Sequence, residues 1–321
     1  MITVSFPGLG IAPFELNPEI VSFGPFSIRW YGLIITLGIV LAFFYTAYRC
    51  KHEGIIFDDL LDIAIFTVIF GVIGARAYYV LTSLDQYHSF RDVIAIWEGG
   101  LAIYGAIIGG AITIFAVCRY KKIPFLKMFD ATVLGVMIGQ ILGRWGNFFN
   151  GEAYGTQVPE SSPLYFIRMG LTPNIESYSQ MYYFHPTFLY ESVWNLIGFL
   201  LIHFLYKKKK FDGQIFFMYI TWYGFGRMFI EGLRTDSLYV GVFRISQVVG
   251  FLCFVTGATV ITVRLIRIRR NTLNATTEYI PTYAKLSHMK PFEAEHAEET
   301  AAVEVEEKII EENTKNQENE E

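Results

Sequence analysis

Seven stretches of this sequence are long and apolar enough to cross a membrane as helices. A membrane-spanning helix needs about 20 consecutive, mostly apolar residues. The stretches cover residues 29–48, 60–82, 100–118, 128–148, 187–206, 213–233 and 244–264. Backbone polar groups in lipid must be satisfied within the segment, which favours helices over irregular chain. We therefore predict an all-α integral membrane protein with seven transmembrane helices.

Clusters of basic residues orient these predicted helices. They follow the first, third, fifth and seventh stretches, at residues 49–52, 119–122, 207–210 and 264–270. All four clusters thus fall on one side, and Lys and Arg concentrate on the cytoplasmic side of membrane proteins. This pattern predicts an extracytoplasmic N-terminus and a cytoplasmic C-terminus.

The same topology divides the chain into parts. Residues 1–28 hold several prolines, and we expect an irregular extracytoplasmic segment along the membrane surface. Residues 29–270 form the seven-helix membrane domain, with an extracytoplasmic insertion at 151–185 between helices 4 and 5. This insertion is rich in Pro, Ser and Tyr, which suits loops and short elements, either as a lid or as a contact for a substrate.

Residues 271–321 hold 13 acidic and 4 basic residues, a net charge of −9, so we expect a disordered cytoplasmic tail.

Ionisable residues inside the predicted spans cluster toward their extracytoplasmic ends. Each costs about 2.5–3.5 kcal/mol on insertion scales, so each is a candidate for function. Side chains that merely reach for the interface would be single Lys or Arg residues at both faces, whereas this group is one-sided and includes acids. Its members are Arg76, Arg144, Glu191, Arg227, Glu231 and Arg234.

Three of these residues have helical spacing. Arg227, Glu231 and Arg234 are at positions i, i+4 and i+7, which lie on one helix face. One interpretation is an ion-paired stripe that only makes burial tolerable. The other is that the two guanidiniums, with Arg144, recognise a phosphate, whose geometry suits the planar arginine fork. At a membrane surface this would be a phospholipid headgroup or a lipid-linked phosphate.

The fourth predicted span ends in a polar, glycine-rich stretch, GRWGNFFNGEAYG (143–155). Arg144 offers phosphate binding, Asn147 and Asn150 offer donors and acceptors, and Glu152 can orient an arginine. The glycines let the backbone leave helical geometry and approach a ligand closely. Irregular backbone at membrane depth needs a protein or polar-cavity cover, so we predict that this stretch is the wall of a polar pocket.

Three functions fit a phosphate-binding pocket at one membrane face: a lipid-modifying enzyme, a transporter of anionic lipids, and a scaffold with a lipid-binding groove. A transporter needs polar residues along a path to the inner face, and the sequence crowds them on the outer side. A scaffold leaves the arrangement from Asn147 to Glu152 unexplained. The basic clusters are of the ordinary membrane-flanking kind, which argues against nucleic-acid binding. We find no metal-ligand spacing and expect no metal or cofactor.

The stretch 143–155 resembles the signature of bacterial prolipoprotein diacylglyceryl transferases. Five further blocks resemble that family in the same order, and the resemblance covers about residues 20–270. These blocks are IRWYGLIITLG (28–38), GARAYYVL (74–81), WEGGLAIYGAIIGG (97–110), HPTFLYE (185–191) and YGFGRMFIEGLR (223–234).

This resemblance implies an enzyme of the bacterial cell membrane with its active site toward the extracytoplasmic face. It would move the diacylglyceryl group of phosphatidylglycerol onto the lipobox cysteine in the signal peptide of a prolipoprotein, releasing glycerol phosphate. The implied partners are phosphatidylglycerol, the prolipoprotein and the surrounding membrane lipids.

The resemblance also implies roles for individual residues. Arg144 and Arg227 would hold the phosphate, Asn147 and Glu152 would bind the headgroup and orient Arg144, and Glu231 would hold Arg227. Further contacts are expected from Tyr31, Arg76, Glu191 and Arg234.

The proton acceptor for the attacking thiol stays open. Some family members carry a histidine, considered a catalytic base, where this chain has Tyr104. A tyrosine, with a pKa of about 10, is a poor base at neutral pH. Alternatively, Tyr104 acts only as a hydrogen-bond donor. The proton of the thiol then passes to His185, to the phosphate or to water. His185 also has a purely structural interpretation, as a polar residue at a helix start.

Overall fold

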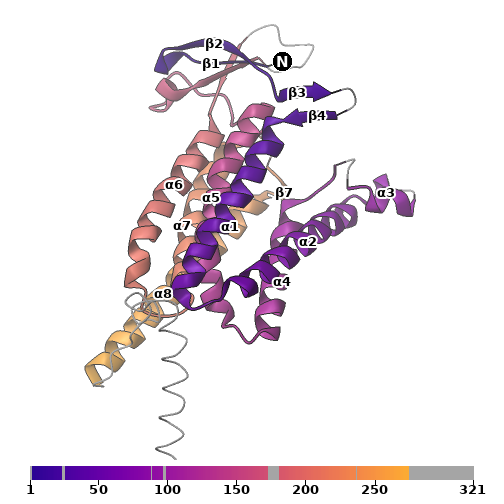
Figure 1. Cartoon of the computed structure of the whole chain (residues 1–321). Helices are drawn as coiled ribbons and strands as arrows, with labels where there is room; N and C mark the ends of the chain where they lie inside the picture. Colours follow the sequence, from indigo (N-terminus) through magenta and orange to yellow (C-terminus); the bar gives the residue numbers. More distant parts are fainter. Residues whose placement is uncertain are drawn as a thin grey trace, which may run out of the picture.

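The computed structural model describes residues 2–23, 26–87, 89–96, 99–172, 181–235 and 237–274. Each of the seven predicted spans is a helix (Figure 1). A short helix, α3 (Phe90–Ile94), lies between the second and third of them. The seven long helices are α1 (Trp30–Glu53), α2 (Phe57–Thr82), α4 (Ile103–Tyr120), α5 (Phe125–Asn150), α6 (Thr187–Leu205), α7 (Gln214–Ile230) and α8 (Ile245–Asn274).

Six of these helices are long and apolar enough to cross a membrane. The exception is α7, which has 17 residues and continues as a 3-10 turn over Glu231–Leu233. At 1.5 Å per residue, α7 is about 26 Å long, slightly less than the roughly 30 Å hydrocarbon core. The chain is a mostly helical, multi-pass membrane protein. The expected acidic tail falls mainly outside the described residues, since α8 ends at Asn274.

The expectation of an irregular N-terminal segment is wrong. Residues from this segment form strands β1 (Ile2–Phe6) and β2 (Ile11–Leu16), and the insertion supplies β5 (Met169–Thr172) and β6 (Tyr182–Phe184). The four strands make one antiparallel sheet in the order β2-β1-β5-β6. Pro7 opens a 3-10 turn and Pro13 lies in an edge strand, where its missing N–H costs no pairing. Two hairpins complete the strands: β3 (Glu19–Phe23) with β4 (Phe26–Arg29), and β7 (Tyr239–Val240) with β8 (Phe243–Arg244).

This four-stranded sheet covers one end of the helical bundle (Figure 1). Its buried face includes Val4, Phe6 and Leu171, which pack against Phe148 near the end of α5 and Phe188 near the start of α6. The N-terminal segment and the insertion therefore lie at the same end of the molecule, as the predicted topology requires.

The opposite end of the bundle carries the basic clusters, and one lysine there is not a surface residue. Lys209 is 3% exposed, and its ammonium contacts Glu53, Asp130 and Asp212 at 2.9–3.2 Å. The interpretation of residues 207–210 as a simple membrane flank is therefore wrong for Lys209, whose neighbours in sequence are exposed. The sequence does not reveal that Lys209 differs from its neighbours, because its partners Glu53 and Asp130 are far from it in the chain. They lie at the end of α1 and the start of α5.

Helices α2 and α4 pack closely because small residues face each other. A side chain on Gly105 of α4 would overlap the carbonyl oxygen of Gly74 on α2, and one on Gly109 would lie 2.6 Å from the carbonyl oxygen of Phe70. Small residues at such contacts let helix backbones approach in lipid, where van der Waals packing holds helices together. Gly105 and Gly109 therefore allow the close packing of α4 against α2.

We expect Gly105→Ala to separate α2 from α4 and to lower the free energy of unfolding by about 1–3 kcal/mol, the usual cost of overpacking. Gly139→Ala is the matched control, because a side chain on Gly139 of α5 meets nothing within 4 Å. That variant should be neutral or stabilised, since alanine favours helices by about 0.5–1 kcal/mol. Thermal unfolding in detergent measures both, and an equally stable Gly105→Ala variant would contradict the packing.

Candidate active site

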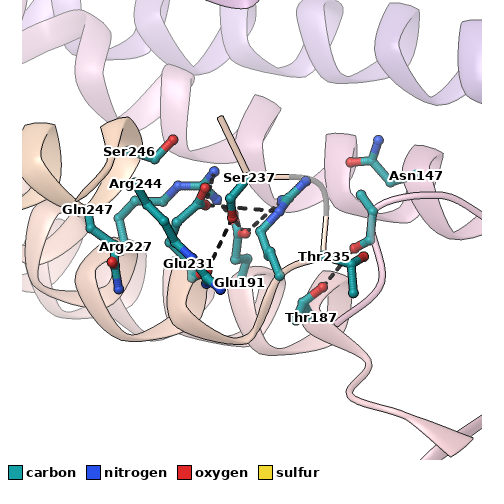
Figure 2. Close-up of polar contacts among 12 residues, drawn as sticks. Asn147, Thr187, Glu191, Arg227, Glu231, Thr235, Ser237, Arg244, Ser246 and Gln247 are labelled. Atoms are coloured by element: carbon teal, nitrogen blue, oxygen red, sulfur yellow. Dashed lines mark hydrogen bonds and ion pairs between the residues drawn. The ribbon is translucent and has the colours of Figure 1, made fainter. Parts of the chain in front are cut away.

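Glu191 of α6 is the centre of a buried cluster of charged residues. Its side chain is 4% exposed. One carboxylate oxygen lies 2.8 Å from Arg144 of α5, and the other lies 2.6 Å from Arg227 of α7 and 3.1 Å from Arg234. Figure 2 shows Glu191 and Arg227 pointing toward each other. The structure therefore joins three predicted arginines through an acid that the sequence presented only as a supporting contact.

A second acid, Glu231, pairs with two of these three arginines. Its carboxylate lies 2.6 Å from Arg227 and 4.0 Å from Arg234, which confirms the predicted i, i+4 pair. The predicted single helix face is wrong in detail, because α7 tightens into a 3-10 turn at Glu231 and Arg234 has extended backbone. Arg234 stays in the cluster because its side chain reaches Glu191.

A fourth arginine was missed by the sequence analysis. Arg244, the last residue of β8, donates to the backbone carbonyl of Glu231 and, at 2.8 Å, to the hydroxyl of Tyr239. It lies beside Glu231 in Figure 2. No local spacing links residue 244 to the signature stretch, so only the fold brings it here.

The cluster carries more positive than negative charge. The four guanidiniums of Arg144, Arg227, Arg234 and Arg244 surround two carboxylates. Arg144 is the most accessible of the three that pair with Glu191, at 22% side-chain exposure against 13% for Arg227 and 10% for Arg234. Buried arginines paired this way are pre-oriented, and the surplus charge suits an anionic ligand.

The signature stretch forms a polar chain that starts at Arg144. Arg144 donates to Asn147 at 3.2 Å, and the amide groups of Asn147 and Asn150 donate to Glu152 at 3.1 and 3.3 Å. Gly151 ends α5 in the left-handed conformation, with φ of 64°, which turns the chain so that Glu152 faces back toward the helix. These hydrogen bonds link Arg144 to Glu152 through Asn147.

Two glycines of this stretch bring other elements close. A side chain on Gly146 would lie 2.9 Å from the ring of Tyr31, so Tyr31 of α1 packs directly on α5. Gly155 donates to the carbonyl of His185 at 2.9 Å and bridges to the backbone of Arg234. The insertion, the start of α6 and the segment after α7 thus meet at Gly155.

Arg76 has different partners from those expected. Its guanidinium, on a residue 7% exposed, donates to four backbone carbonyls, those of Asp92, Val93, Gly99 and Gly100. These bonds fasten the segment between α2 and α4. The structure therefore gives Arg76 a structural role that does not depend on a ligand.

Tyr104 and His185, the two candidate proton acceptors, have hydroxyl partners. The Tyr104 hydroxyl lies 2.8 Å from that of Ser246 in the first turn of α8. His185 Nδ1 lies 3.1 Å from the hydroxyl of Tyr190, and burial lowers the pKa of His185. His185 is therefore neutral at neutral pH and can accept a proton.

Among the described residues, no group of three or more His, Cys, Asp or Glu side chains could hold a metal ion. The chemistry that the cluster can perform on its own is anion binding, stabilisation of a developing negative charge and hydrogen bonding. These are the requirements for displacing a phosphate ester.

Replacing Glu191 tests whether it holds the arginines together. We expect Glu191→Gln to lower the free energy of unfolding by about 3–5 kcal/mol, because it leaves buried guanidiniums without a charge partner. The control Glu19→Gln removes an exposed pair with Arg29 at 3.4 Å and should cost less than about 1 kcal/mol. Denaturant unfolding in detergent compares the two, and similar small losses would contradict a central role for Glu191.

The buried His185 makes stability depend on pH. Its pKa is lowered in the folded state, so its contribution is complete above the unfolded pKa of about 6.5 and is lost as the pH falls through the folded value. We expect the melting temperature of the wild type to fall more between pH 7.5 and 5 than that of His185→Asn. Parallel curves for the two proteins would show that His185 is not desolvated.

Comparison with known proteins identifies the family of this chain. Residues 18–263 match the family model described as prolipoprotein diacylglyceryl transferase. The chain is 44% identical over 251 residues to phosphatidylglycerol–prolipoprotein diacylglyceryl transferase 1 of Clostridium perfringens, covering 77% of this chain and 94% of that protein. It is 42% identical over 263 residues to the transferase of Lysinibacillus sphaericus, covering 79% and 94%. It is 39% identical over 253 residues to that of Ligilactobacillus salivarius, covering 77% and 92%. The chain belongs to the prolipoprotein diacylglyceryl transferase family.

Proposed function

We propose that this protein transfers the diacylglyceryl group of phosphatidylglycerol to the lipobox cysteine of prolipoproteins, the first step of lipoprotein maturation. The product is a thioether on the cysteine, and glycerol phosphate is released. The relatives are named phosphatidylglycerol–prolipoprotein diacylglyceryl transferases, which supports the donor, the acceptor and the transferred group.

The observation that carries the proposal is the convergence of Arg144 and Arg227 on Glu191. Two guanidiniums from different helices, 2.8 and 2.6 Å from one carboxylate, are held side by side in a buried setting. Counting Glu152 with Glu191 and Glu231, the four guanidiniums exceed the carboxylates by one charge. A phosphodiester carries one negative charge, so the site can bind it without adding net charge to a low-dielectric region.

The reaction uses these arginines where charge develops. The cysteine sulfur attacks the glyceryl carbon that bears the phosphate ester, a C–S bond forms, and the C–O bond to phosphate breaks. The electron pair of that bond leaves on glycerol phosphate, whose new charge Arg144 and Arg227 stabilise. The thiol must lose its proton, because the thiolate is the nucleophile and the free thiol has a pKa of about 8.5.

Neighbouring residues have supporting roles in this proposal. Asn147 and Glu152 orient Arg144 and bind the glycerol headgroup, and Tyr31 lies against the same stretch. Glu231 and Arg234 fix Arg227. Tyr104 contributes its hydroxyl as a hydrogen-bond donor, and the neutral His185 is the candidate proton acceptor.

An apolar groove beside the cluster suits an acyl chain. It has a volume of about 420 Å³ and runs between the insertion, α6 and α7. Ile230 and Leu233, which flank Glu231, line it together with Val193 and Ile197. A lipid with its phosphate at the arginines can place a chain here without exposing it to water.

The membrane arrangement completes the proposal. The chain crosses the membrane seven times, with α7 as the short span, and the four-stranded sheet lies on the extracytoplasmic side. The basic clusters then lie in the cytoplasm, in keeping with the distribution of Lys and Arg. The cluster faces the outer leaflet, where the signal peptide presents its lipobox cysteine, and the acidic tail is a separate cytoplasmic segment.

We expect Arg144→Ala and Arg227→Ala each to lower transfer about 10²- to 10³-fold, since each removes a preorganised charge that stabilises the leaving group. The assay incubates the detergent-solubilised enzyme with acyl-labelled phosphatidylglycerol and a lipobox peptide, and follows label on the peptide thiol. Arg29→Ala, at a side chain 60% exposed, is the control and should retain activity. Normal turnover by either arginine variant would refute its assigned role, and a wild type that never labels the peptide would refute the proposed function.

A further inference from the structure

Helix α7 begins without a cap of its own. Its N-cap residue is Gly213, which has φ of 91° and offers no side chain. The first backbone N–H groups of a helix have no partner within the helix, so they need one from elsewhere. For a helix inside a membrane protein, leaving these groups unsatisfied is costly.

Asp130 of α5 supplies the missing cap across the helix interface. One oxygen of its fully buried carboxylate accepts from the N–H of Gly213 at 2.7 Å, and the other accepts from the N–H of Phe216 at 2.8 Å. In a capping box, these N-cap and N3 amides are satisfied by two side chains of the same helix. Here one carboxylate on another helix does both, and its charge suits the positive end of the helix dipole.

Asp130 is itself held in place. Lys209 lies 3.0 Å from the same carboxylate and donates at 2.9 Å to both oxygens of Glu53, which also accepts from Tyr206. The carboxylate thus has partners from α7 and from the segment before it, and it cannot shift without breaking buried ion pairs.

Equal spacing along two helices connects this cap to the arginine cluster. Asp130 is as far from Arg144 along α5 as Gly213 is from Arg227 along α7. Each separation corresponds to about 21 Å of helix. The two helices run in the same direction from the contact between Asp130 and Gly213. Arg144 and Arg227 therefore lie at the same position along the helix axes, where both contact Glu191.

We propose that Asp130 is a positioning residue. It sets the register of α7 against α5 and so places the two phosphate-binding arginines at the same depth along the helix axes. It touches no substrate and acts through the helices. A slip of α7 by one residue would move Arg227 by about 1.5 Å along the axis, and misplacement of about 1 Å at a reacting centre can cost about 10²-fold in rate. The activity readout rests on the proposed function.

The test compares two variants. Asp130→Ala removes both acceptor oxygens, and Asp130→Asn keeps one of them. If Asp130→Ala does not fold, the conservative Asp130→Asn variant still tests the role of Asp130. Asp212→Asn is the matched control, because Asp212 contacts Lys209 at 3.2 Å and is 32% exposed. Transfer is measured per folded enzyme with phosphatidylglycerol and a lipobox peptide. We expect kcat to fall about 10²-fold in Asp130→Ala, less in Asp130→Asn and not in Asp212→Asn, with KM within about threefold.

A second readout measures register without activity. Nitroxide labels are placed on exposed positions of α5 and α7, Val136 and Phe229, with Cys253 replaced by Ala and the buried Cys50 and Cys118 left in place. Pulsed electron paramagnetic resonance gives their separation, and labels at Ile65 and Ile112 on α2 and α4 give a reference distance. We expect Asp130→Ala to broaden the first distance distribution or to shift it by up to about 1.5 Å for each residue of slip, and to leave the reference unchanged.

Unchanged kcat in Asp130→Ala would overturn the inference. Loss of activity with an unchanged α5–α7 distance would also overturn it, because that result assigns Asp130 another role. If the wild type itself transfers no diacylglyceryl group, the proposed function fails, and the label distances still decide whether Asp130 sets the register.

Discussion

The buried carboxylate of Glu191 is the interaction on which the site depends. Three guanidiniums contact it, from α5, from α7 and from the segment after α7. Any one of these arginines would be costly in an apolar bundle, and so would the glutamate. Together they satisfy one another and fix three elements at a single point. The surplus of positive charge that remains is what an anionic lipid headgroup requires.

The rest of the architecture protects this point. The four-stranded sheet covers the end of the bundle where α5 stops and α6 begins, and its apolar face packs on Phe148 and Phe188. Gly155 ties the insertion to the backbone of His185 and Arg234. At the far end, Lys209, Glu53 and Asp130 form a second buried ionic cluster. Helices α5 and α7 are thus fixed at both ends, which suits a site whose chemistry depends on placement.

Much of this molecule could be predicted from the sequence, for identifiable reasons. Hydropathy is a local property that a window of about 20 residues captures, so all seven long helices were predicted, although α8 runs further than expected. The i, i+4 pair of Arg227 and Glu231 and the polar chain from Arg144 to Glu152 are also local. The sheet was missed because β1, at the start of the chain, pairs with β5 from the distant insertion.

The other differences between the predicted and the observed site also arise from contacts between residues that are far apart in the sequence. The partners of Glu191 all come from other elements, far from it in sequence, so its central position could not be read from spacing. Arg244 joins the cluster only because a hairpin returns the chain to Glu231. Arg76 resembled a ligand-binding residue by depth and charge, but its partners are backbone carbonyls of an irregular segment. Lys209 differs from its exposed neighbours only through contacts with distant acids.

Whether Arg144 and Arg227 bind one lipid phosphate can be tested by cryo-electron microscopy of the protein in a lipid nanodisc that contains phosphatidylglycerol. We expect a lipid phosphate within hydrogen-bonding distance of the guanidiniums of both Arg144 and Arg227, with its glycerol headgroup near Asn147. A phosphate bound elsewhere, with Arg144 and Arg227 facing separate cavities, would contradict it.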